Sequence, residues 1–104
     1  MRIAMWSGPR NLSTAMMYSF GARSDFTVMD EPFYAPFLAS SGKDHPMRAE
    51  ILAAHETDPD AVARACLAPT STPHLYMKHM PHHMADGFPM AWAADCVNVH
   101  LIRH

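Results

Sequence analysis

The stretch at residues 7–14 constrains the fold more than any other part of the chain. It reads Ser-Gly-Pro-Arg-Asn-Leu-Ser-Thr, follows a short apolar run at 3–6 and precedes a run at 15–20 with helix-like spacing. A strand that leads through a tight turn into a helix gathers the free N–H groups of the first helical turn, and the helix dipole favours negative charge there. We therefore expect a fold in which this turn binds an anion.

The residue types in this turn are suited to a phosphate or sulfate group. Gly8 lets the backbone approach closely, Arg10 offers a fork of donors for oxyanions, and Ser13 and Thr14 add hydroxyl groups. The spacing is not that of a Walker A loop, because no second glycine and no lysine precede the hydroxyl pair. An ordinary strand–turn–helix junction with a polar N-cap is the alternative.

Composition limits the classes of function. The 104 residues are enough for at most one domain, and 8 basic against 10 acidic residues give a net charge of −2, which argues against nucleic acid as a partner. Cys66 and Cys96 lack metal-site or redox-motif spacing and are expected as buried apolar side chains in a cytoplasmic protein. No signal peptide and no apolar run of membrane-spanning length is recognisable. The oligomeric state is not readable.

Apolar periodicity and turn residues predict alternating strands and helices. Strands are expected at 2–6, 26–29, 74–79 and 96–102, the last of them buried. Helical segments are expected at 11–23, 33–40, 46–55 and 59–67, with a short helix at 81–85 and a short helical or irregular piece at 88–92. Asp58 is the expected N-cap of the segment that starts with Pro59. This alternation predicts an α/β fold, a parallel sheet with flanking helices.

Ligands of a parallel sheet bind outside the carboxyl ends of its strands. Beyond the turn at 7–14, two acidic residues, Asp30 and Glu31, follow the second predicted strand. Lys78 and His79 end the third, and Arg103 ends the fourth. We expect these groups to converge at one edge. A solvated side chain is the first expectation for Lys78, with anion binding as the alternative.

These motifs resemble those of a known family. Pro9-Arg10 and Ser13-Thr14, followed by residues 30–34 (Asp-Glu-Pro-Phe-Tyr), resemble the bacterial sulfotransferase-like proteins. These form a branch of the superfamily that uses 3′-phosphoadenosine 5′-phosphosulfate (PAPS). Residues 78–81 (Lys-His-Met-Pro) are similar to the Lys-Thr-His-Leu-Pro segment of cytosolic sulfotransferases, and residues 99–103 to a strand that ends in Ile-Arg-Asp-Pro. Asn11 and Leu12 depart from the Ser-Gly of the family loop.

The resemblance implies a P-loop-type nucleotide-binding fold, of which residues 1–104 would be the N-terminal, truncated part of a single domain. The implied reaction moves a sulfuryl group from PAPS to a hydroxyl or amine of a small-molecule acceptor. Arg103 matches the arginine that binds the 3′-phosphate. The implied residues for the 5′-phosphosulfate are Gly8, Pro9, Arg10, Asn11, Leu12, Ser13 and Thr14.

Two residues compete for the role of catalytic base, while Arg10 would stabilise charge on the sulfonate and the leaving phosphate. His79 has an unperturbed pKa near neutrality and aligns with the histidine that the superfamily uses. Glu31 is the rival, because some bacterial sulfotransferases use a carboxylate after the second strand. His79, His82 and His83 lack further ligands nearby, so no metal site is expected.

Two other functions stay open on the sequence alone. The departure at Asn11 and Leu12 fits a non-catalytic fragment or nucleotide-binding module that keeps the fold without the chemistry. A P-loop phosphotransferase that uses a nucleoside triphosphate is the other alternative, and the missing Walker lysine argues against it.

Overall fold

The computed structural model describes residues 1–8, 13–41 and 47–101. Strands and helices alternate along the chain, and η denotes a 3-10 helix. The elements are β1 (Arg2–Ser7), α1 (Ser13–Gly21), β2 (Phe26–Asp30), α2 (Tyr34–Ser41), α3 (Arg48–Ala54), α4 (Pro59–Leu67), β3 (His74–His79), η1 (Pro81–His83), η2 (Ala91–Asp95) and β4 (Val97–Leu101).

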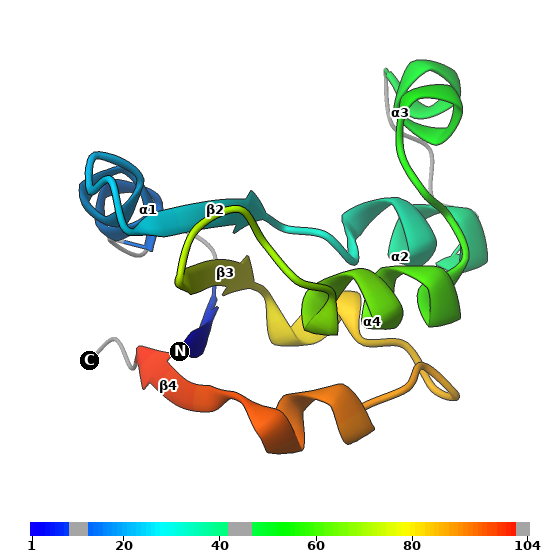
Figure 1. Ribbon diagram of the computed structural model, residues 1–104. Coiled ribbons are helices and arrows are strands. Elements are labelled where there is room, and N and C mark those ends of the chain that lie inside the picture. Colours follow the sequence, from blue (N-terminus) through cyan, green and yellow to red (C-terminus); the bar gives the residue numbers. More distant parts are fainter. Residues whose placement is uncertain (9–12, 42–46, 102–104) are drawn as a thin grey trace.

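The four strands form one parallel sheet in the order β2-β3-β1-β4 (Figure 1). Register places Asp30 of β2 and Met5 of β1 on either side of Lys78 in β3. The expected α/β architecture is confirmed, and each predicted strand is present within two residues of its expected bounds.

Helices cover both faces of the sheet. On one face α1 packs over β2 and β3, and its Met17 joins Met5 and Tyr76 in a buried cluster. On the other face α4 and η2 pack over β1 and β3, where the core contains Trp6 and Trp92. Since side chains of a strand alternate between the two faces, neighbouring residues of β1 and β3 enter different cores. In Figure 1, α3 is the helix farthest from the strands.

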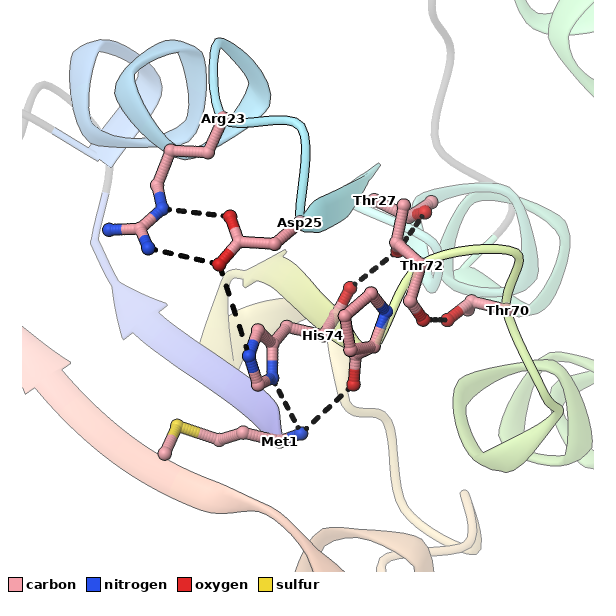
Figure 2. Close-up of polar contacts among 8 residues, drawn as sticks. Met1, Arg23, Asp25, Thr27, Thr70, Thr72 and His74 are labelled. Carbon is pink, nitrogen blue, oxygen red and sulfur yellow. Dashed lines mark hydrogen bonds and ion pairs between the residues drawn. The ribbon is translucent and has the colours of Figure 1, made fainter.

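The amino ends of three strands are joined by polar contacts (Figure 2). Arg23 donates from Nε and Nη2 to the two oxygens of Asp25, each at 3.0 Å. His74 stands between Asp25, whose Oδ2 is 4.0 Å from Nε2, and the α-amino group of Met1, which is 2.9 Å from Nδ1. This network lies at the end of the sheet opposite to the groups that were expected to bind a ligand.

Local signals account for the start of α4. The side chain of Asp58 accepts a hydrogen bond from the backbone N–H of Asp60 at 3.0 Å, and Pro59 occupies the first helical position. Both features were expected, and both follow from the unpaired N–H groups that a helix leaves in its first turn.

The piece at 88–92, expected as helical or irregular, is irregular as far as Met90 and continues as the 3-10 helix Ala91–Asp95. One expectation for the C-terminal part is wrong. β4 is not buried, because Val97 and Val99 are 49% and 39% exposed. The physical reason is its place at the edge of the sheet, since α1 lies on the same face as these two valines but packs mainly over β2 and β3. Within the described ranges, no helix has the length and apolarity needed to cross a membrane.

Candidate anion-binding and catalytic site

The carboxyl ends of β1 and β3 lie at the switch point of the sheet. The chain leaves β1 through α1 on one face toward β2, and leaves β3 through η1 and η2 on the other face toward β4. Adjacent strands whose connections run in opposite directions open a crevice outside their carboxyl ends, which is where α/β proteins bind ligands.

Lys78 is the centre of this crevice. Its side chain is buried, and Nζ donates a 2.9 Å hydrogen bond to Oγ1 of Thr14 in the first turn of α1. Nζ also lies 3.8 Å from Oδ1 of Asp30 and 3.9 Å from Oε2 of Glu31. The expectation of a solvated lysine is therefore wrong. Its position in β3 turns the side chain toward the α1 face, where the helix covers it.

A buried ammonium lies beside the start of α1, within hydrogen-bond distance of Thr14. The N–H groups of the first helical turn and the helix dipole add to the charge of Lys78 at the same place. Ser7, at the end of β1, is buried, and its Oγ has no hydrogen-bond partner among the described residues. The chemistry of these donors fits an oxyanion.

Glu31 is held in an unusual backbone conformation. Its φ angle is +47°, in the left-handed region that non-glycine residues rarely adopt. Its N–H donates to the carbonyl of Lys78 at 3.0 Å, and its own carbonyl accepts from the N–H of Tyr34 at 3.0 Å. These bonds fix Glu31 between β3 and α2, with its carboxylate beside the lysine. Strained residues of this kind concentrate at functional sites.

His79 lies on the opposite face from Lys78. Only 2% of the residue is exposed, and its ring stacks on Trp6 with centroids 4.8 Å apart and lies 4.9 Å from Trp92. Burial, with a smaller effect of nearby His83, lowers the pKa of His79 to about 4. Its Nε2 has no hydrogen-bond partner in the described part of the chain. His79 is thus a core residue whose neutral form is favoured.

The structure brings together some of the predicted site residues. Thr14, Glu31 and Lys78 converge, and the half-buried Gly8 follows β1 at the same edge. Ser13 starts the helix. The remaining predicted residues lie outside the described part of the chain; they are Pro9, Arg10, Asn11, Leu12 and Arg103. No group of three or more His, Cys, Asp or Glu that could hold a metal occurs among the described residues.

Sequence reasoning undervalued Lys78 and left Ser7 without a role. The available signal was the alternation of β3, where the apolar Leu75 and Met77 alternate with Tyr76 and Lys78. This pattern places Lys78 on the same face as Tyr76. The acidic pair after β2 gave a second signal, since a buried lysine needs an anionic partner.

Comparisons with known proteins place the chain in a family. The model of the family described as "Sulfotransferase domain" matches residues 1–104. Branched-chain-amino-acid aminotransferase-like protein 2 of Arabidopsis thaliana is 38% identical over 103 residues, which cover 98% of this chain and 18% of that protein. Branched-chain-amino-acid aminotransferase-like protein 1 of Arabidopsis thaliana is 41% identical over 103 residues, which cover 98% of this chain and 19% of that protein. The chain spans about a fifth of the length of these curated relatives.

No solved structure gives a significant match. The chain belongs to the sulfotransferase domain family.

Proposed function

We propose that this chain forms the donor-binding and base-bearing part of an enzyme that transfers a sulfuryl group from PAPS to a hydroxyl or amine. The observation that carries this proposal is the position of Lys78. Its ammonium is buried at the start of α1, bonded to Thr14 and 3.9 Å from the carboxylate of Glu31. A cation for the donor and a base for the acceptor therefore stand side by side.

The donor site is assigned from the groups that surround Lys78. The N–H groups of the first turn of α1, the hydroxyl of Thr14 and the ammonium of Lys78 hold the 5′-phosphosulfate, and the unpaired Oγ of Ser7 is available to it. Arg10 and Ser13 are assigned to the same group from their place in the loop. Arg103 is assigned to the 3′-phosphate by the family resemblance. We take residues 1–104 to be the N-terminal part of one domain.

In the proposed reaction Glu31 removes the proton of the acceptor. The acceptor oxygen or nitrogen forms a bond to sulfur while the bond between sulfur and the phosphate oxygen breaks, which leaves a sulfonated acceptor and 3′-phosphoadenosine 5′-phosphate (PAP). The proton resides on the Glu31 carboxylate and then passes to solvent. Lys78 stabilises the charge that develops on the leaving phosphate, as a fixed cation in a site shielded from water does efficiently.

We assign the base to Glu31 in preference to His79. His79 is enclosed by Trp6, Phe33 and Trp92, on the face of the sheet that Lys78 does not enter. A base must come within hydrogen-bond reach of the proton that it removes. In this proposal the role of His79 is to fill the core beneath the site.

The test is formation of PAP from PAPS in the presence of hexan-1-ol and hexan-1-amine, the simplest hydroxyl and amine probes. It is run with the chain and with any longer form of the protein. Glu31→Gln keeps the size of the side chain and is expected to lower the rate about 100-fold or more. Glu50→Gln, an exposed site on α3, is the matched control and is expected to change nothing. Full activity of Glu31→Gln would contradict the assignment, and turnover with ATP in place of PAPS would favour the phosphotransferase.

A further inference from the structure

A cavity of about 550 Å³ opens beside the proposed base. It lies where β2 ends, between α2, α3 and α4, the helices at the right of Figure 1. Its size falls in the range of small-molecule sites, about 300–1,000 Å³. Most of its wall is apolar and comes from several elements. The apolar lining includes Met29, Pro32, Ala35, Ile51, Val62 and Ala65.

The cavity adjoins the proposed catalytic groups in a fixed order. Thr14 at the start of α1 bonds Lys78, Lys78 lies 3.9 Å from the carboxylate of Glu31, and Glu31 lines the cavity. Glu31 is therefore the residue that the cavity shares with the group of contacts around Lys78. This order is the one that an acceptor requires, because its hydroxyl must meet both the base and the sulfur.

The polar part of the lining contains more acidic than basic groups. Three carboxylates contribute, from Asp30, Glu31 and Glu56, together with the imidazole of His55, and none of the described lining residues is a lysine or arginine. Lys78 brings one positive charge to the two carboxylates that follow β2. Glu56 comes from the connection between α3 and α4, and its Oε1 accepts a hydrogen bond from the backbone N–H of Asp58 at 3.1 Å. It adds a second source of negative charge to the lining, from a different segment of the chain than Glu31.

An aromatic residue also belongs to the lining. Tyr34 lines the cavity from the start of α2, and its ring lies 5.1 Å from the ring of His83, measured between centroids. The face of an aromatic ring attracts cations, and quaternary ammonium groups are recognised in this way. Carboxylates combined with an aromatic ring and aliphatic walls match a molecule that has an apolar body and a cationic group.

We propose that this cavity is the acceptor site, and that the acceptor is a small, largely aliphatic alcohol that carries an ammonium group. The alcohol meets Glu31 and the ammonium group lies toward Glu56. This inference rests on the proposed function. Transfer forms the bond between the alcohol oxygen and sulfur, breaks the bond between sulfur and the phosphate of PAPS, and delivers the alcohol proton to Glu31.

The test compares three probes of one length by calorimetric titration, without PAPS. The cationic probe is (6-hydroxyhexyl)trimethylammonium, its uncharged isostere is 7,7-dimethyloctan-1-ol, and the anionic probe is 7-hydroxyheptanoate. The cationic probe is expected to bind at least about tenfold more tightly than the anionic one, and about fivefold more tightly than the isostere. Tightest binding of the anionic probe would overturn the proposal.

Variants connect this binding to the cavity. Ala61 lines the cavity, so Ala61→Phe is expected to lower the affinity for the cationic probe at least about tenfold, whereas Ala53→Phe on α3 is the control. Glu56→Gln is expected to remove the roughly fivefold advantage of the cation over its isostere, with Glu50→Gln as control. An unchanged affinity in Ala61→Phe would overturn the site.

Titration of the same variants with PAP separates the two proposals. PAP binding by wild type and by Ala61→Phe, together with failure of all three probes, would overturn the acceptor site and leave the proposed function standing. Binding of the cationic probe without any binding of PAP would support the cavity and contradict the donor assignment.

Discussion

At the scale of single residues, Glu31 combines a functional position with an unfavourable backbone. Its φ of +47° costs a non-glycine residue about 1–2 kcal/mol relative to glycine. The carboxylate lies 3.9 Å from Nζ of Lys78, and two backbone hydrogen bonds, with Lys78 and Tyr34, hold the residue in place. Backbone strain therefore occurs at the residue that the proposed reaction uses as its base.

This cost predicts that Glu31→Gly separates stability from activity. The free energy of unfolding is expected to stay unchanged or to rise by up to about 1 kcal/mol, because glycine adopts a positive φ without strain. Sulfuryl transfer is expected to be lost. Chemical denaturation measures the first effect. Glu50→Gly, within α3, should instead lower stability by about 1 kcal/mol. A destabilisation of Glu31→Gly as large as that of Glu50→Gly would refute the argument.

At the scale of an element, β3 explains how two adjacent residues acquire opposite roles. Lys78 enters the α1 face and His79 enters the aromatic core formed with Trp6 and Trp92. The sequence predicts the strand itself, its end and the polar residues at that end. It does not show which face receives a helix that covers a charged side chain, because that depends on the order of the strands. The burial of Lys78 was missed for this reason.

The core position of His79 predicts an acid-sensitive fold. Burial lowers the pKa of His79 from 6.5 to about 4, so the unfolded chain binds more protons than the native state between these values. The contribution of His79 to the free energy of unfolding is therefore at its maximum above pH 6.5. It decreases as the pH falls toward 4, by an amount on the order of 3 kcal/mol. Denaturation across this range measures the effect.

Two variants distinguish the contribution of His79 to this pH dependence from that of other histidines. His79→Phe, which keeps an aromatic ring in the core, is expected to flatten the pH dependence, although His83, whose pKa burial also lowers to about 4, retains part of it. His55→Phe, at an exposed position, should leave the slope as it is in the wild type. An equal slope in His79→Phe and the wild type would contradict the account.

At the scale of the whole molecule, the strand order β2-β3-β1-β4 assembles the site. β3 enters the sheet between β1 and β2, so Lys78 comes to lie between the helix that follows β1 and the acids that follow β2. The α/β class and the convergence at one edge were predictable from alternating elements and from polar residues at strand ends. The exposed β4 and the conformation of Glu31 were not, because both arise from tertiary packing.

Binding of PAP by the chain and by any longer form of the protein is the measurement that tests the central claim most directly, with ATP as the competing ligand. The account predicts that calorimetry detects PAP and not ATP. Lys78→Met is expected to weaken PAP binding about 10–100-fold, as the loss of a charge-assisted hydrogen bond implies. Arg64→Met, which removes a charge from the exposed surface of α4, is expected to leave it unchanged. ATP bound as tightly as PAP, or PAP binding that does not depend on Lys78, would contradict it.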